Sequence, residues 1–166
     1  MFIILLRMHE KCLSIDQATL RAKQYCSYQE RCHSEVKEKL YSFGLHRNDV
    51  DTILSGLIEE NYLNEQRFAI LYAGGKFRIK QWGRVKIRYS LKQKQVSEYC
   101  INKALEQFED DEYGQVLRSL AEKKSQLLRG EKNKYIKKRK LQEHLMQKGF
   151  EPDLVRQEVS NLVPVK

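Results

Sequence analysis

The stretch NEQRFAILYAGGKFRIKQWGRVKIRYSLKQKQVSEYCINKAL, residues 64–105, decides the fold of this chain. Its apolar residues recur at helical spacing and it contains no proline, which is typical of amphipathic helices rather than strands. Asn64 can cap the first of these helices, and we expect Phe68, Leu71 and Ile79 to point inward from it. The stretch therefore predicts three short helices.

The same stretch carries the excess positive charge of the chain. Residues 66–97 contain nine bases and no acid, whereas the whole chain has 31 Lys and Arg against 22 Asp and Glu, a net charge of +9. Such segregation indicates an anionic partner, either a nucleic acid or an acidic protein surface. A solvated face is the alternative. We expect the partner to be met by Lys76, Arg78, Lys80, Arg84, Lys86, Arg88, Lys92 and Lys94.

A second basic run, residues 132–140, is diluted by Glu131 and Glu143. An isolated run of this kind is more often a solvated helix face than a binding surface.

One pattern recurs three times along the chain, at offsets of 51 and 54 residues. Each copy has two apolar residues four apart, a turn followed by an apolar residue, and two further apolar residues four apart. This arrangement predicts a striped helix, a turn and a second striped helix packed back on the first. The copies are Val36, Leu40, Gly44, Leu45, Val50 and Leu54; Ile87, Leu91, Gln95, Val96, Ile101 and Leu105; and Leu141, Leu145, Gly149, Phe150, Val155 and Val159.

With a further helix before each copy, the pattern predicts an all-α fold, an elongated, curved array of three tandem three-helix repeats. We assign residues 1–13 to an N-terminal extension and the repeats to residues 14–62, 63–108 and 109–166. Gln95 stands where the other copies have glycine. Because left-handed backbone costs a non-glycine residue about 1 kcal/mol, we expect the middle turn to differ in conformation.

Local signals place further helix ends. Ser14 or Asp16 can cap the first helix, Ser34 the second and Ser97 the helix that follows the middle turn. Inward positions are also expected at Ile15, Val85 and Leu127.

Nothing in the sequence indicates an enzyme, a cofactor or a metal site. The four histidines are scattered and form no catalytic spacing with a nucleophile. The cysteines lack the paired spacing of a zinc site, so buried free thiols are expected at Cys12, Cys26, Cys32 and Cys100. The N-terminal apolar segment is too short for a signal peptide or a membrane span, which predicts a cytoplasmic protein without membrane contact.

These residues resemble the bacterial regulatory protein family RecX, whose signature reads like Y-L-D-D-x-R-F-A followed by G-x-x-R/K-I and a leucine. The matching positions are Tyr62, Leu63, Arg67, Phe68, Ala69, Gly83, Ile87 and Leu91. Asn64-Glu65 departs from the usual two acids, which would weaken any partner contact made by the first acid. The segment Trp82–Ile87 is similar to Bacteroidetes members.

The resemblance implies a non-catalytic protein that binds the RecA filament on DNA and restrains its ATP turnover, strand exchange and co-protease activity. We expect a monomer. The alternative is a direct DNA-binding protein, either helix-turn-helix-like or a single-strand binder, that acts without RecA. Phe77, Trp82 and Tyr89 interleave with the bases and could stack on nucleobases, although core packing is the stronger expectation for Phe77 and Trp82.

Overall fold

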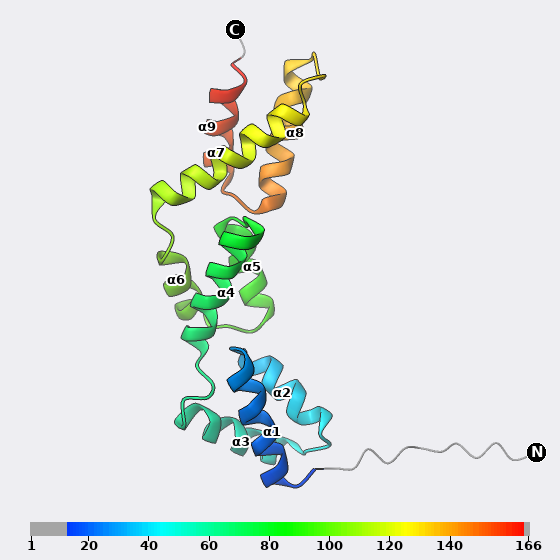
Figure 1. Ribbon diagram of the computed structural model, residues 1–166, viewed down its shortest axis with the longest axis vertical. Helices are drawn as coiled ribbons and strands as arrows, with labels where there is room; N and C mark the ends of the chain where they lie inside the picture. Colours follow the sequence, from blue (N-terminus) through cyan, green and yellow to red (C-terminus); the bar gives the residue numbers. More distant parts are fainter. Residues whose placement is uncertain (1–12, 165–166) are drawn as a thin grey trace, which may run out of the picture. The chain divides into compact units, whose positions relative to one another are not determined.

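The computed structural model describes residues 13–164, which form nine α-helices and no strand (Figure 1). The predicted all-α fold is thereby confirmed. The helices are α1 (Ile15–Tyr28), α2 (His33–Ser42), α3 (Arg47–Glu59), α4 (Glu65–Lys80), α5 (Arg84–Gln93), α6 (Glu98–Glu106), α7 (Asp110–Leu127), α8 (Lys134–Lys148) and α9 (Pro152–Leu162).

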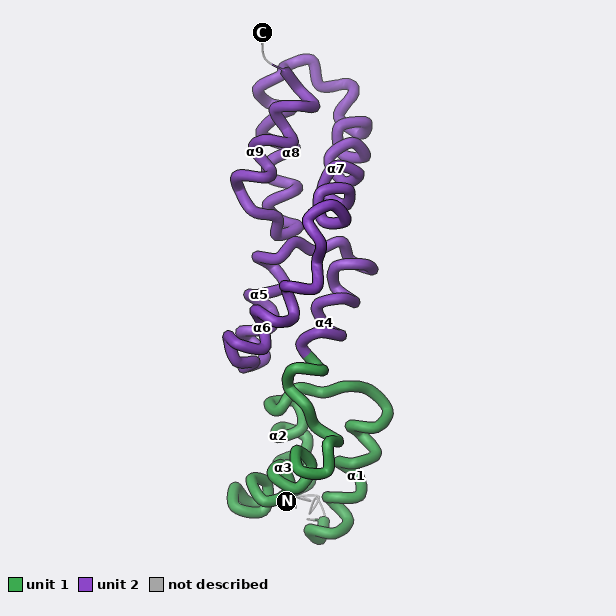
Figure 2. Tube along the Cα trace, turned by 90° about the vertical axis from the view of Figure 1, so that its left-hand side faces the viewer, with its two compact units in different colours: residues 1–68 green, residues 69–166 purple. Residues whose placement is uncertain are grey.

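The chain divides into two compact units, Met1–Phe68 and Ala69–Lys166 (Figure 2). The first unit holds α1 to α3 and the first turn of α4. The second unit holds the rest of α4 and α5 to α9. The predicted N-terminal extension falls almost wholly on residues 1–12, outside the described residues, and the limits of the three repeats stay a prediction.

Unit 1 is a three-helix bundle in which α1 packs against α2 and α3. Its core includes Ala18, Val36, Leu40 and Val50, all fully buried. Small and branched side chains at helical spacing bury one stripe of each helix, which holds the bundle together.

Two expectations for unit 1 need correction. Ser14 does cap α1, since its hydroxyl accepts from the Gln17 backbone N–H at 3.3 Å. Ile15 is nevertheless 49% exposed rather than inward. Ser34 lies inside α2, whose N-cap is Cys32, because the helix begins at His33.

The three repeated turns share one backbone conformation. Gly44 has φ of 80°, Gln95 of 61° and Gly149 of 91°, so all three lie in the left-handed region. The apolar residue after each turn is buried, and the backbone N–H groups of Val96 and Phe150 reach back to Leu91 and Leu145 in α5 and α8. The expectation of a different middle turn is wrong: capping the helix end and burying Val96 outweigh the cost of a left-handed glutamine.

α4 buries Phe68 as expected, but in unit 2 it turns a different face inward from the one expected. It buries Ala69, Ala73 and Phe77, whereas Leu71 is 59% and Ile79 78% exposed. Apolar residues surround this helix on several sides, so their periodicity does not single out one face. The small alanines allow close packing of the helix, and Phe77 supplies the bulk of its buried surface.

The expected inward positions Val85 and Leu127 are also wrong, at 50% and 81% exposed. Tyr113, which the sequence did not single out, is buried at the start of α7 and stacks between Phe77 and Phe150. A tyrosine amid acidic residues gives no local signal of burial. Around it, α7, α8 and α9 pack against one another as a second three-helix bundle.

Candidate partner-binding surface

The signature arginine, Arg67, is an internal brace of unit 1. Its Nε donates to the Glu30 carboxylate at 2.6 Å, and its two terminal nitrogens donate to the Asn61 side chain and carbonyl at 3.1 and 3.0 Å. Asn64 caps α4 as expected, its side-chain oxygen accepting from the Arg67 backbone N–H at 2.8 Å. Tyr62 lies under the Lys23 ammonium, and Leu63 is buried. These signature positions therefore have contacts within the fold.

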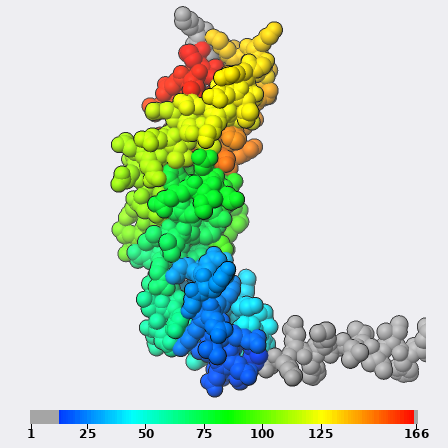
Figure 3. Space-filling view, in the orientation of Figure 1, coloured from blue at the N-terminus to red at the C-terminus, as the bar shows by residue number. Residues whose placement is uncertain are grey.

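A second group of signature residues builds a seam inside unit 2, where the start of α5 meets the end of α8. The Gly83 N–H donates to the Lys148 carbonyl at 2.9 Å, and the Val85 N–H donates to the Gly149 carbonyl at 3.0 Å. In the space-filling view the green surface of α4 and α5 meets the orange segment near residue 150 (Figure 3). The positive end of one helix dipole thus faces the negative end of another.

Glycine is required on both sides of this seam. A Cβ on Gly83 would lie 2.2 Å from the Gly149 carbonyl oxygen, and a Cβ on Gly149 would lie 2.2 Å from the Lys86 Cβ. Backbone atoms cannot move aside as a flexible side chain can. The signature glycine therefore permits the close approach of two helix ends.

Tyr113 completes the seam. Its hydroxyl accepts from the Arg84 backbone N–H at 2.9 Å and donates to the Glu151 carboxylate at 2.7 Å. Burial raises the pKa of the Tyr113 phenol well above its usual range, because the ionised ring would be poorly solvated there. The hydroxyl thus satisfies one of the free N–H groups that begin α5.

Arg84, predicted to face a partner, lies in the seam as well. Its guanidinium donates to the Phe108 carbonyl at 2.8 Å, pairs with Asp110 at 2.9 Å and stacks on the Tyr113 ring at 4.1 Å. Grooves of about 590 and 410 Å³ flank it, and Asp110 lines both. The structure assigns Arg84 to the seam, so the charge that it can offer to a partner is largely offset.

Arg88 and Lys92, the other two members of the four-residue series on α5, share one acid. Arg88 pairs with Glu98 and donates to the Asn102 side chain at 2.8 Å, and the Lys92 ammonium lies 3.0 Å from the same carboxylate. Hydrogen bonding from Lys92, with the charge of both bases, lowers the pKa of the Glu98 carboxyl. One negative charge therefore serves two bases here.

Lys76 and Lys86 differ from these residues. Their ammonium groups lie 5.0 and 4.7 Å from the centre of the Trp82 ring, and within residues 13–164 neither forms an ion pair. Phe77 is fully buried, as expected of a core residue, whereas Trp82 is mostly buried and keeps part of its ring exposed. Lys76, Trp82 and Lys86 together are the lysine–tryptophan surface.

The remaining predicted bases lie around that surface. Lys76 and Lys94 both approach the Tyr72 ring, at 5.0 and 5.6 Å. Arg78 and Lys80 are exposed at the end of α4. The Lys148 ammonium donates to the Lys80 carbonyl at 3.2 Å, and the Lys86 ammonium donates to the Gln147 carbonyl at 3.0 Å. The end of α8 thus adds a further cation beside α4.

Other chemistry receives no support from the described part of the chain. Between residues 13 and 164, no three His, Cys, Asp or Glu side chains gather as a metal site would require. Cys26, Cys32 and Cys100 are buried and free, and burial raises the pKa of the Cys26 thiol; Cys12 lies outside the described residues. No helix in this range has the length and apolar character needed to cross a bilayer.

Comparison with known proteins defines the class of this chain as a helical protein of tandem three-helix domains. Residues 64–105 match the family model for the RecX second three-helix domain, and residues 110–159 match the model for the third. A crystal structure of RecX from Lactobacillus salivarius has a TM-score of 0.81 and 25% identity, covering 91% of this chain and 97% of that one. A second structure, of a regulatory protein RecX, has a TM-score of 0.79 and 26% identity, covering 87% and 70%.

Sequence relatives agree with the structural neighbours. The regulatory protein RecX of Prosthecochloris aestuarii is 30% identical over 147 residues, 89% of this chain and 94% of the relative. The one from Bacillus cytotoxicus is 29% identical over 86% of this chain. This chain belongs to the RecX family of regulatory proteins. It spans about half the length of the Bacillus cytotoxicus relative, 52%.

Proposed function

We propose that this chain regulates the RecA recombinase in the cytoplasm by binding, as a monomer, to RecA filaments on DNA. In this proposal it acts without catalysis and restrains RecA ATP turnover, strand exchange and co-protease activity. Membership of a family of regulatory proteins supports the role. The resemblance of its signature to the RecX pattern supports RecA as the partner.

The observation that carries the proposal is the lysine–tryptophan surface. Two ammonium groups lie 5.0 and 4.7 Å from the centre of the partly exposed Trp82 ring, and neither has an acidic partner in the described structure. Cations without a carboxylate partner keep more of their attraction for an anionic partner than paired cations do, although Lys86 also donates to the Gln147 carbonyl. A nucleoprotein filament presents DNA phosphates and acidic protein groups side by side, and either would match this surface.

RecA ATP hydrolysis on single-stranded DNA, titrated with this chain, tests the proposal. We expect hydrolysis to fall as the chain is added, and the concentration for half inhibition to rise steeply between low and moderate salt, because cation–anion contacts are screened. Hydrolysis that stays constant at saturating concentrations of the folded chain would contradict the proposal.

Direct binding to single-stranded DNA is a second candidate function, favoured by the partly exposed ring of Trp82. A base stacked on an aromatic ring contributes roughly 1–3 kcal/mol, and the two lysines would hold the flanking phosphates. Anisotropy of a labelled oligonucleotide without RecA tests it. Trp82→Ala should weaken binding at least about fivefold, whereas Tyr89→Ala, on an exposed ring that stacks with neither lysine, should not.

A further inference from the structure

Positive charge gathers in a second place, at the turn between α7 and α8. Residues 123–140 hold nine bases and one acid, a net charge of +8, whereas the chain outside this segment and residues 66–97 has a net charge of −8. Unit 2 therefore carries two concentrated basic segments on a chain that is otherwise acidic. A solvated helix face usually mixes charges of both signs, whereas this segment holds a single acid, Glu131, among its nine bases.

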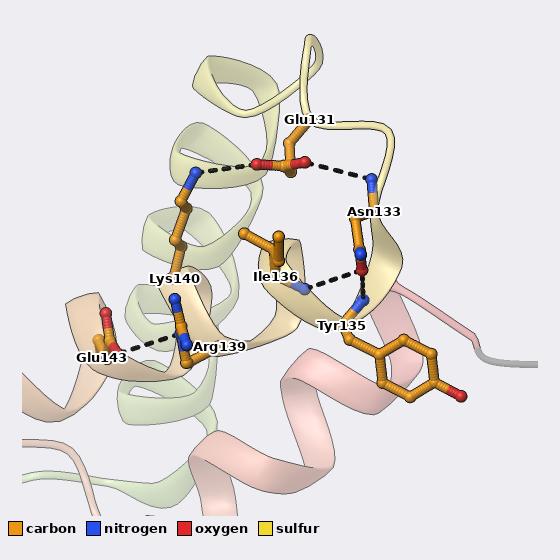
Figure 4. A network of polar contacts seen from close by, with 7 residues as sticks. All are labelled: Glu131, Asn133, Tyr135, Ile136, Arg139, Lys140 and Glu143. Carbon is orange, nitrogen blue, oxygen red and sulfur yellow. Dashed lines mark hydrogen bonds and ion pairs between the residues drawn. The ribbon is translucent and has the colours of Figure 1, made fainter.

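The single acid of the segment, Glu131, forms its contacts within the turn and the start of α8. The Glu131 carboxylate accepts from the Lys140 ammonium at 2.9 Å and from the Asn133 backbone N–H at 3.2 Å (Figure 4). Arg139 pairs with Glu143 at 3.6 Å. Glu131 and Glu143 thus pair with Lys140 and Arg139, and the Glu131 carboxylate, which lies at the start of α8, is already bound there.

The lysines at the start of α8 have no such partner. Within the described residues, Lys132, Lys134, Lys137 and Lys138 form no ion pair. Lys132 and Lys134 are exposed, and Tyr135 beside them is 72% exposed, pointing away from the helix (Figure 4). These four lysines with Tyr135 are the α8 basic tip.

The placement of these lysines opposes the stability of their own helix. α8 has no acid in its first turn and begins with Lys134, although cations are disfavoured at the positive end of a helix dipole. The one other helix of the described chain that begins in this way is α5, where Arg84 is offset by Asp110 in the seam. No internal contact of that kind accounts for the lysines of α8.

Further positive charge lies around His144 in the bundle of α7, α8 and α9. Burial lowers the pKa of the His144 imidazole, and the charges of Lys124 and Lys148 lower it further. Lys124 and Lys148 thus add positive potential around His144, outside the lysines at the start of α8.

We propose that the α8 basic tip is a second nucleic-acid contact, which binds the phosphate backbone of DNA independently of RecA. The nearly acid-free run of long lysine side chains fits a polyanion of regular charge spacing, and the exposed Tyr135 lies where a sugar or base would pack. The 15 residues of α8 place the tip about 21 Å from the seam.

A matched pair of double variants tests this contact in the full chain. Lys132→Gln with Lys134→Gln removes two lysines of the tip, and Arg139→Gln with Lys140→Gln removes two bases of the same run that are already paired. Both variants lose two charges. Affinity for a labelled 30-base-pair duplex, without RecA, is measured by anisotropy at several salt concentrations, and folding is checked by circular dichroism.

In the tip variant, we expect the plot of log association constant against log salt concentration to become less steep by about 2. Binding at low salt should weaken about tenfold, since two phosphate contacts are lost. The paired-base variant should shift the slope by less than about half as much. Lys134→Glu, which suits the helix dipole, should raise the melting temperature and still weaken binding.

Three results would overturn the proposal: equal losses in the two double variants, an unchanged slope in the tip variant, or no duplex binding by the folded parent chain. None of them bears on RecA inhibition, which is measured separately. Polyglutamate, added at the same charge concentration as the duplex, serves as a competitor. If it displaced the duplex, and if the tip variant lost binding to polyglutamate but not to DNA, the partner would be an acidic protein and the DNA assignment would fail.

Discussion

The two sides of α5 use basic residues in opposite ways. On one side, Arg84 holds the seam, and Arg88 and Lys92 share Glu98. On the other side, Lys86 lies with Lys76 over Trp82 without an acidic partner in the described chain. The difference teaches that a basic segment of sequence divides into charges that the fold uses and charges left for a partner.

Gly83→Ala should have the largest effect on the structural side. The new Cβ would lie 2.2 Å from the Gly149 carbonyl, so the helix ends must separate and their hydrogen bonds weaken. We expect a loss of about 3 kcal/mol in the free energy of unfolding, measured with urea.

Gly75→Ala is the matched control for this glycine, because a Cβ there meets nothing within 4 Å and the residue lies in α4. It should be neutral or stabilise the fold by up to about 1 kcal/mol. If both alanine variants lost the same free energy of unfolding, the close approach at the seam would not explain the effect of Gly83→Ala.

Tyr113→Phe should have the next largest effect. It keeps the stacked ring but leaves the Arg84 N–H and the Glu151 carboxylate without the hydroxyl, at a cost of about 1–3 kcal/mol. Urea unfolding measures the loss. Tyr135→Phe, on an exposed ring, serves as the control, and a stability of Tyr113→Phe equal to that control would show that the hydroxyl is not part of the seam.

Glu98→Gln should make two bases that are paired within the fold available to a partner. Arg88 and Lys92 lose their shared acid, so the affinity for DNA or RecA filaments should rise and its salt dependence should steepen. Because Glu98 is a surface group, little change is expected in the melting temperature. Weaker binding by this folded variant would contradict the division proposed for α5.

A pH effect should be the smallest. The pKa of His144 is lowered in the folded chain, mainly by burial, so the unfolded chain binds more protons just below the ordinary pKa of 6.5. Stability should therefore fall as the pH drops from 7.5 through 6.5 and level off below the lowered folded-state pKa. Melting temperatures of the parent chain and of His144→Gln, measured across this pH range, check the prediction. An equal dependence on pH in both proteins would show that His144 is not the cause.

Local signals in the sequence predicted much of the helical framework. Ser14 and Ser97 cap the helices expected of them, and Gly44 and Gly149 end theirs in the left-handed conformation. These features depend on neighbours within a few residues, and propensity and spacing therefore describe them well. Gln95 shows the limit, because tertiary packing imposes a turn that its own backbone preference disfavours.

The division of charge was beyond the reach of sequence patterns. Arg84 and Lys86 are two residues apart in one basic segment, yet Arg84 finds Asp110 and the Phe108 carbonyl far along the chain. Such partners depend on how α5 meets α7 and α8, which no local spacing encodes. The same holds for Tyr113, whose burial follows from the seam rather than from its acidic neighbours.

The central claim is tested most directly by inhibition of RecA ATP hydrolysis with two double variants of equal charge. Lys76→Gln with Lys86→Gln should raise the concentration for half inhibition about tenfold, because unneutralised contacts are lost. Arg88→Gln with Lys92→Gln should raise it less than about threefold, since those bases are already paired. An equal or larger loss in the second variant, with both proteins folded, would contradict the account.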